Sequence, residues 1–278
     1  MGSSTSGSTG NGSLPAGVRP SKALGQNFLL DPNLAAAIVR DASVGPGTCV
    51  VEVGAGLGAL TIALAEAGAE RVLALEFDRA LLPPLRDAVR DRPSIEVVHQ
   101  DATKADWPAL LGDDTWVCCA NLPYNVGTGI VLDLLEQPAV ERFVVMLQRE
   151  VAERLIATPA EREAYGAVSL RVAYRATGRI VRTVPPEVFW PRPKVGSAVV
   201  RLDRRARPPV DVDEATLWRV VDAAFAERRK TMRNALRRLG LSAREADRAL
   251  TEAGVQPDAR PETLDLQAFA RVVTAVGP

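Results

Sequence analysis

The residues with the clearest chemistry are the tetrapeptide Asn121-Leu122-Pro123-Tyr124, which follows a hydrophobic run at 115–120 that is typical of a buried strand. The Asn121 side-chain carbonyl and the backbone carbonyl of Leu122 or Pro123, stiffened by the proline ring, are two fixed hydrogen-bond acceptors. An exocyclic amino group of a nucleobase has two N–H groups to donate, and the Tyr124 ring offers a base a flat stacking surface. The tetrapeptide therefore predicts a site that holds an adenine amino nitrogen for methyl transfer. Asn and Pro are also common where a strand enters a turn, so these residues alone leave a purely structural role open.

A second motif, V-E-V-G-A-G-L-G at 51–58, places a glycine-rich turn between a predicted strand and a predicted helix. Glycines allow the backbone to approach a ligand closely, and the first amides of the helix add N–H donors. The spacing G-x-G-x-G, with Glu52 before Gly54, differs from the G-x-G-x-x-G of dinucleotide-binding proteins. The turn by itself indicates a ligand but does not identify it.

Carboxylates follow the next two predicted strands. Glu76 closes the strand at 71–76, where a carboxylate can bind both hydroxyls of a ribose, and Asp101 follows the strand at 95–99, where it can accept a hydrogen bond from an adenine amino group. Either carboxylate could instead cap a helix. Ligands of open α/β sheets bind at the carboxyl ends of the strands, where the glycine turn, both carboxylates and Asn121 all fall. This order predicts an S-adenosylmethionine site.

Strands and helices alternate along most of the chain. Strands are predicted at 48–53, 71–76, 95–99, 116–120, 142–148 and 198–202, and helices at 31–41, 59–67, 80–90 and 129–136. The first helix has Asp31 as a predicted N-cap and Pro32 at its first position. The alternation predicts an α/β fold with a parallel sheet covered by helices on both faces.

The chain divides into three regions by composition and pattern. Residues 1–20 are rich in Gly, Ser and Thr and are expected to be a disordered tail. Residues 21–207 hold the alternating elements, and residues 208–278 show helices only, predicted at 213–226, 230–239, 243–253 and 266–276. We therefore expect a large α/β domain followed by a small all-α domain.

The composition excludes several classes of protein. No stretch of the 278 residues is long and apolar enough to span a membrane, and the N-terminus lacks the pattern of a secretory signal. The three cysteines, Cys49, Cys118 and Cys119, have no metal-ligand spacing, and His99 is the only histidine. We expect no metal, no membrane association, and reduced thiols in the cytoplasm, with the adjacent cysteines as small core residues rather than reactive groups.

Charge is uneven along the chain although the net charge is zero. Residues 182–278 contain 18 Lys and Arg against 13 Asp and Glu, and residues 1–181 contain 16 against 21. This asymmetry predicts that the C-terminal part contacts a phosphate backbone, although ordinary solvated helix faces would look similar. The candidate RNA-binding residues are Arg228, Arg229, Lys230 and Arg233.

Taken together, these motifs closely resemble the small-subunit (16S) ribosomal RNA adenine N6,N6-dimethyltransferase family, the kasugamycin-resistance dimethyltransferases. The matching segments are LGQNFL at 24–29, VEVGAGLGALT at 51–61, NLPYN at 121–125, VPPEVFWPRPKV at 184–195 and FAERRKTMRN at 225–234. Two positions depart from the family pattern: Gly196 stands where Asp is usual, and Ala55 where Pro is frequent. Neither is a residue to which we assign chemistry.

The resemblance implies a Rossmann-like S-adenosylmethionine-dependent methyltransferase sheet with a C-terminal helical RNA-binding domain. Asn27 and Leu29 are then expected to contact the donor, together with Gly54, Glu76, Asp101 and Asn121. Phe189 is expected to cover the second face of the target base, with an ordinary core phenylalanine as the alternative.

The implied substrate is a pair of adjacent adenines in the 3′-terminal stem-loop of small-subunit rRNA, within an immature 30S particle. Each adenine would receive two methyl groups during ribosome biogenesis. We expect catalysis by positioning and electrostatics, without a titrating general base, and a protein that acts as a monomer.

Three other functions fit parts of the pattern. A 23S rRNA adenine N6-methyltransferase of macrolide resistance shares the fold and chemistry, but R-P-K-V after Pro191 and the Arg-Arg-Lys run favour the small-subunit enzyme. A non-catalytic nucleic-acid-binding or assembly factor on the same fold is disfavoured by the intact Asn121 and Tyr124. A nicotinamide dehydrogenase is disfavoured by the glycine spacing.

Overall fold

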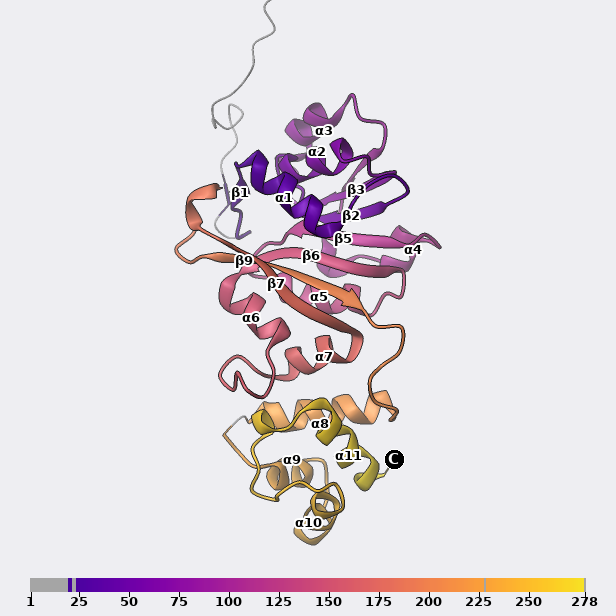
Figure 1. The fold of residues 1–278 in the computed structure, drawn as a ribbon, viewed down its shortest axis with the longest axis vertical. Coiled ribbons are helices and arrows are strands. Elements are labelled where there is room, and N and C mark those ends of the chain that lie inside the picture. The colour runs from indigo at the N-terminus through magenta and orange to yellow at the C-terminus, as the bar shows by residue number, and fades with distance from the viewer. Residues whose placement is uncertain (1–19, 22–23, 228, 278) are drawn as a thin grey trace, which may run out of the picture.

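A computed structural model describes residues 20–21, 24–227 and 229–277 of the chain, so all but the last residue of the predicted tail lies outside the described residues. An α/β part built on one large sheet carries a group of C-terminal helices at one end (Figure 1). In the part of the chain that the structure describes, no helix is long and apolar enough to cross a membrane.

The large sheet has seven strands in the order β4-β3-β2-β5-β6-β9-β7. They are β2 (Cys49–Val53), β3 (Arg71–Glu76), β4 (Ile95–His99), β5 (Trp116–Asn121), β6 (Val140–Gln148), β7 (Ala176–Val184) and β9 (Ser197–Arg204). Neighbours from β4 to β6 are parallel, whereas β9 runs antiparallel between β6 and β7. The chain order reverses between β2 and β5, which opens a crevice at the carboxyl ends of these two strands.

The sheet is parallel, as predicted, except at the edge formed by β9 and β7. A parallel neighbour needs a crossover connection of a dozen or more residues, usually a helix. Between β7 and β9 the chain forms only the short helix η2 (Pro186–Val188) and the strand β8 (Phe189–Trp190). The chain therefore turns back and β9 pairs with both neighbours in the opposite direction.

Helices cover both faces of the sheet, as the alternation predicted. One face carries α1 (Pro32–Ala42), α2 (Ala59–Glu66) and α3 (Leu82–Val89). The other carries α4 (Trp107–Leu111), α5 (Gly127–Leu135), α6 (Arg149–Ile156) and α7 (Ala167–Arg175). Successive residues of β5 point to opposite faces, so Cys118 and Cys119 enter different cores, and both are fully buried. The prediction that they are small core residues is confirmed.

The start of α1 follows the sequence prediction. The Asp31 side chain accepts hydrogen bonds from the backbone N–H groups of Asn33 and Leu34, and Pro32 occupies the first helical position. The carboxylate thus satisfies amides that have no partner inside the helix.

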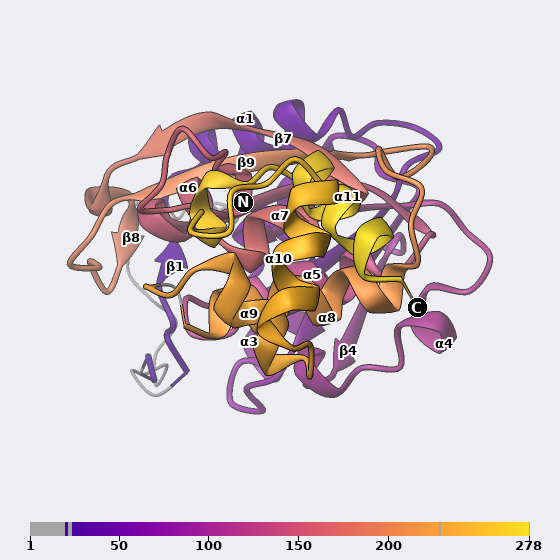
Figure 2. The same cartoon turned by 90° about the horizontal axis from the view of Figure 1, so that it is seen from below.

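A second, two-stranded sheet lies at the edge of the crevice. It pairs β1 (Phe28–Leu29) antiparallel with β8, so that Phe28 is opposite Trp190 and Leu29 is opposite Phe189 (Figure 2). The segment before β1 packs against the loop after β5: a Cβ built on Gly25, whose φ is +64°, would lie 3.6 Å from the backbone nitrogen of Tyr124. The pairing therefore holds the N-terminal segment over the predicted site.

The C-terminal helices build a second hydrophobic core. They are α8 (Glu214–Ala226), α9 (Met232–Arg238), α10 (Ala243–Glu252) and α11 (Leu266–Val276), with the short helix η3 (Pro261–Thr263) before α11. Tyr165, Leu170 and Tyr174, which precede residue 208, also belong to this core. The Tyr174 and Trp218 rings meet edge to face with centroids 5.2 Å apart, so α7 and α8 join the two parts.

Candidate active site

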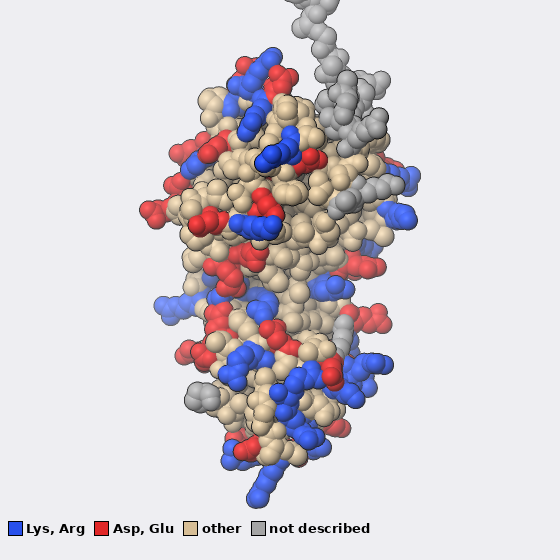
Figure 3. Space-filling model, turned by 180° about the vertical axis from the view of Figure 1, so that it is seen from behind, with Lys and Arg blue, Asp and Glu red and all other residues tan. Residues whose placement is uncertain are grey.

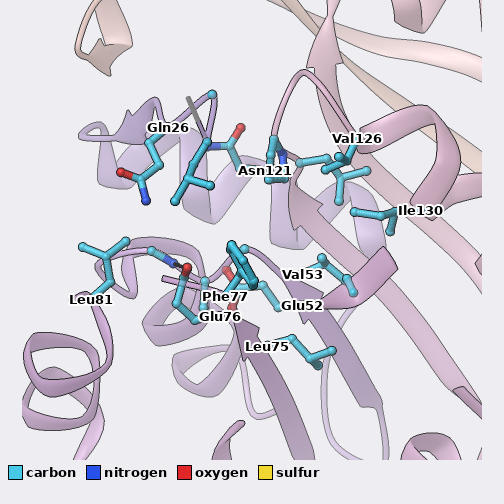
Figure 4. A pocket seen from close by; sticks show the side chains of 18 of the residues that line it. Gln26, Glu52, Val53, Leu75, Glu76, Phe77, Leu81, Asn121, Val126 and Ile130 are labelled. Carbon is cyan, nitrogen blue, oxygen red and sulfur yellow. Dashed lines mark hydrogen bonds between the residues drawn. The ribbon is translucent and has the colours of Figure 1, made fainter. Parts of the chain in front are cut away.

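A cavity of about 270 Å³ lies at the carboxyl ends of β2, β3, β4 and β5 (Figure 4). Its walls come from the segment before and within β1, the glycine turn, the two strand-end carboxylates and the loop after β5. The structure brings together the predicted residues Asn27, Leu29, Gly54, Glu76, Asp101, Asn121, Leu122, Pro123 and Tyr124, all of which line this cavity.

The glycine turn adopts a backbone that other residues rarely allow. Gly54 has φ +77° and Gly56 has φ +59°. A Cβ on Gly54 would lie 3.4 Å from Pro123 Cδ, and one on Gly56 would lie 3.2 Å from Phe28 Cδ1. These glycines therefore let the turn lie directly against β1 and the tetrapeptide loop, with its amides at the cavity.

Glu76 ties this turn to β3. One carboxylate oxygen, Oε2, accepts from the Gly56 N–H at 2.8 Å, and Oε1 accepts from the Asp78 N–H at 2.7 Å. Burial raises the pKa of Glu76, while these two backbone hydrogen bonds act against the rise. Each oxygen keeps a further lone pair, so the carboxylate can still accept hydrogen bonds from two hydroxyls of a ligand.

Asp101 has both of the roles considered from sequence: it caps η1 (Ala102–Lys104) and it lines the cavity. Its Oδ1 accepts from the Thr103 backbone N–H at 3.0 Å and from the Thr103 hydroxyl at 2.7 Å. The hydroxyl bond is the main reason that the pKa of Asp101 is lowered. The carboxylate is thus ionised and its second oxygen can accept a hydrogen bond from a ligand amino group.

The Asn121 side chain is oriented by the N-terminal segment. Its Nδ2 donates to the backbone carbonyl of Asn27 at 2.9 Å, which leaves Oδ1 as the acceptor of the amide group. The Pro123 carbonyl already accepts from the Gly127 N–H at 2.9 Å, whereas among the described residues the Leu122 carbonyl accepts no backbone hydrogen bond outside regular structure. Of the two backbone acceptors left open by the sequence, the Leu122 carbonyl is the free one.

Tyr124 is anchored through its hydroxyl, which shares a 2.7 Å hydrogen bond with Ser197 Oγ at the start of β9. Burial raises the pKa of Tyr124, so the phenol is neutral and remains hydrogen bonded. Ser197 itself is 1% exposed. The bond restricts the Tyr124 ring at the wall of the cavity, where the sequence predicted a stacking surface.

Phe189 differs from the other predicted residues. Its side chain is 3% exposed and belongs to the core beneath α1, with Met146 and Val199. It is not among the residues that line the cavity. Its role as a cover for the target base stays a prediction.

Among the cavity residues that the sequence did not predict as site residues, Phe77 and Glu52 have properties that suit a ligand site. Phe77 follows Glu76 directly, lines the cavity and is 51% exposed. Its place in the sequence, an aromatic residue at a strand end beside a candidate ligand carboxylate, could have identified it. Glu52 is 1% exposed, and its Oε2 has no hydrogen-bond partner within the described residues. Burial, with a further contribution from Glu76, raises the pKa of Glu52 to about 8.

These features suit S-adenosylmethionine. The donor combines a cationic amino-acid end, a ribose with two hydroxyls and an adenine ring. The cavity offers a group for each part. The unpartnered Glu52 oxygen could hold the cationic end, the Glu76 carboxylate could hold the ribose hydroxyls, and the apolar walls around Phe77 and Leu81 could hold the adenine ring. Across the described ranges, no group of three or more His, Cys, Asp or Glu side chains is placed to hold a metal ion.

The predicted RNA-binding residues that the structure describes lie among the C-terminal helices, where basic side chains gather (Figure 3). Arg229 and Lys230 are exposed, and Arg228 lies outside the described residues. Arg233 forms an ion pair with Asp247. Lys230 also lines an open hollow with Asn234, Arg237 and Arg238. The exposed Arg229 and Lys230 are accessible to phosphates, and RNA binding by this region stays a prediction.

Comparisons with known proteins agree with this geometry. A family model described as "Ribosomal RNA adenine dimethylase" matches residues 18–276. Two curated proteins named "Ribosomal RNA small subunit methyltransferase A" are similar to the chain. The one from Acidothermus cellulolyticus is 43% identical over 94% of this chain and 90% of its own length, and the one from Thermobifida fusca is 45% identical over 92% and 90%.

Solved structures show the same fold. The 23S rRNA methyltransferase ErmE is 30% identical, with a TM-score of 0.68 over 90% of this chain and 99% of its own. A dimethyladenosine transferase from Plasmodium falciparum is 22% identical, with a TM-score of 0.71 over 88% of this chain and 95% of its own. At that identity the second likeness concerns the fold alone.

Proposed function

Because this chain belongs to the ribosomal RNA adenine dimethylase family and is an S-adenosylmethionine-dependent rRNA methyltransferase, we propose that it dimethylates two adjacent adenines in the 3′-terminal stem-loop of 16S rRNA. The observation that carries the proposal is the oriented amide of Asn121, whose free Oδ1 lies in one cavity with the glycine turn and Glu76. The choice of the small subunit is supported by sequence identity: the chain is 43% and 45% identical to the two proteins named "Ribosomal RNA small subunit methyltransferase A", and 30% identical to the 23S rRNA methyltransferase ErmE.

The acceptor amino group would be held by two oxygens. A flipped-out adenine donates its N–H groups to Asn121 Oδ1 and the Leu122 carbonyl, and these acceptors favour a pyramidal nitrogen with its lone pair aimed at the donor. Bound S-adenosylmethionine supplies an electrophilic methyl group on a sulfonium sulfur. The N–C bond forms as the S–C bond breaks, and the amino proton then leaves to solvent. The residues therefore act by position and charge.

Tyr124 would stack against one face of the adenine. Its ring stays in place because Ser197 holds its hydroxyl. Phe189 remains our candidate for the other face; since its ring is buried in the neighbouring core, this role requires the ring to turn towards the cavity.

RNA would also contact the C-terminal helices. We propose residues 21–207 as the methyltransferase domain and 208–278 as the RNA-binding domain, with Arg228, Arg229, Lys230 and Arg233 as phosphate contacts. The separate core of the C-terminal helices supports this division, although α7 contributes to that core. The substrate is an immature 30S particle in the cytoplasm, and the enzyme acts as a monomer without a metal.

The deciding experiment uses labelled S-adenosylmethionine and small ribosomal subunits that lack the modification, followed by mass mapping of the 3′ stem-loop. We expect two dimethyladenines, and none with Asn121→Ala. Methylation of large-subunit rRNA alone would assign the protein to the macrolide-resistance enzymes instead. RNA binding without transfer to either subunit would favour the non-catalytic assembly factor.

A further inference from the structure

Trp190 is a large hydrophobic side chain that faces solvent. It is 40% exposed, and the other large exposed hydrophobic residues of the described chain are Leu30, Phe77 and Val195. Phe77 lies in the donor cavity, so its exposure is explained. The other three lie outside that cavity, and two of them, Leu30 and Trp190, lie on or directly beside the β1–β8 ribbon.

The register of the ribbon shows which side chains share a face with Trp190; on that face Leu30 is also exposed, whereas Phe28 is buried. Phe28 is opposite Trp190, and the Leu30 N–H donates to the Val188 carbonyl at 3.0 Å, which continues the same ladder. Directly opposite residues share a face and faces alternate along a strand, so Phe28, Leu30 and Trp190 lie on one face. The opposite face carries Leu29 and Phe189, and both are buried in the core.

This face adjoins the acceptor site. Phe28 lines the cavity and follows Asn27, whose carbonyl orients Asn121. Adjacent Cα atoms are about 3.8 Å apart and opposite ones in such a pair about 5.5 Å, so Trp190 Cα lies within about 10 Å of Asn27 Cα. The ribbon therefore lies next to the position where a base would meet Asn121.

A free cation accompanies the indole. Lys194 is exposed in the loop after β8 and has no ion-pair or hydrogen-bond partner among the described residues. Arg192 in the same loop is instead paired with Glu187. An exposed aromatic face with a free cation nearby is the combination that binds single-stranded nucleic acid, because any base can stack and each nucleotide carries a phosphate.

We propose that Trp190 stacks on a nucleotide that neighbours the target adenine in the substrate RNA and that Lys194 contacts an adjacent phosphate. The proposal rests on the proposed function. A base flipped into the cavity leaves its neighbours without one stacking partner, and the indole replaces that partner. The contact thus offsets part of the cost of flipping and holds the loop open over the site.

The test measures binding of the full-length protein to unmodified small subunits. Trp190→Leu retains an apolar side chain but removes the aromatic face, and we expect it to weaken binding by about 5- to 150-fold, the range of one stacked base. Trp190→Phe retains an aromatic face for stacking, so its affinity for the subunits should fall less than that of Trp190→Leu. Val195→Ala is the matched control, an apolar truncation in the same loop, and should bind within about twofold of wild type. Thermal unfolding checks that each variant is folded.

Ultraviolet crosslinking identifies the partner. Mass mapping should find residue 190 joined to a nucleotide beside the target adenines in wild type. Trp190→Leu binding like wild type, or a crosslink only to a ribosomal protein, would overturn the inference. Methylation of the loop by wild-type protein is measured in parallel; if it proceeds while Trp190→Leu binds normally, the stacking contact fails and the proposed function stands.

Discussion

Asn121 Nδ2 donates a hydrogen bond of 2.9 Å to the backbone carbonyl of Asn27, a residue 94 positions earlier in the chain. The bond crosses from the loop after β5 to the segment before β1 and fixes which atom of the amide group remains an acceptor. A backbone carbonyl can only accept, so the Asn121 oxygen is left for a ligand amino group. The N-terminal segment therefore lines the same cavity as Asn121 and also orients its amide group.

Replacing Asn121 by alanine removes an acceptor that matters most when the amino nitrogen becomes pyramidal. We expect kcat to fall by about 100- to 1000-fold, the typical effect of losing one preorganised polar group, with a smaller change in donor affinity. Steady-state kinetics on unmodified small subunits measure both quantities.

Asn27→Ala is the matched variant, because it removes a side chain but retains the carbonyl that orients Asn121. We expect it to raise the KM for the donor more than it lowers kcat. Equal losses of kcat in the two variants would contradict the assigned roles.

Replacing Glu76 by alanine should weaken donor binding. The change leaves the Gly56 and Asp78 amides without their partner and removes the acceptor proposed for the ribose hydroxyls. Lost hydrogen bonds to a charged group cost about 1.5–3 kcal/mol each, so the Kd should rise by at least about tenfold. Calorimetry with S-adenosylhomocysteine measures this value.

Glu96→Ala is the control, because Glu96 lies on the neighbouring strand β4 and is largely exposed. It should leave the Kd unchanged, and an equal loss of affinity in this variant would point to general unfolding.

Glu52 should give folding stability a distinctive pH dependence. Burial raises its pKa from 4.5 to about 8, whereas the unfolded chain retains the ordinary value. Between these values the folded protein holds a proton that the unfolded chain releases. The contribution of Glu52 to the free energy of unfolding is therefore greatest at low pH and falls by about 1.4 kcal/mol per pH unit across the window.

Glu52→Gln removes this titration. Urea unfolding of both proteins at several pH values between about 5 and 8 should show the variant gaining stability relative to wild type as pH rises. Glu96→Gln, exposed on β4, serves as the control and should give a constant difference. Parallel curves for the Glu52 variant would show that the carboxyl ionises normally in the folded protein.

Arg204 should be important for stability. Its guanidinium donates to four backbone carbonyls around the end of α5 and the start of β6, those of Leu134, Leu135, Gln137 and Val140. A lysine ammonium is a single point charge and cannot reproduce this fork of donors. We expect Arg204→Lys to lower the free energy of unfolding by about 2–4 kcal/mol.

Urea unfolding measures the loss, and Arg179→Lys is the control, since its side chain is 64% exposed and lies 4.0 Å from Asp203. That change should cost less than about 0.5 kcal/mol. Similar losses at both positions would mean that the backbone contacts of Arg204 contribute little.

The sequence alone determined the features that depend on local pattern. Apolar runs located β2 to β6 and the Asp31–Pro32 pair located the start of α1, because strand alternation, helix caps and turn residues act over a few positions. The sequence also predicted that the glycine turn, the two carboxylates and Asn121 lie together, because parallel strands bring their carboxyl ends to one edge and chain order then predicts neighbours in space.

Tertiary structure alone decided the direction of β9, the Asn27–Asn121 and Tyr124–Ser197 hydrogen bonds, and which aromatic residue of β8 faces solvent. Phe189 and Trp190 are adjacent and both aromatic, so composition cannot separate them. A shift of one residue in pairing would exchange their faces, and the register is set by long-range packing of β1 against β8. The sequence therefore left Phe189 open as either the cover of a base or a core residue, and the fold buries its side chain while leaving Trp190 at the surface.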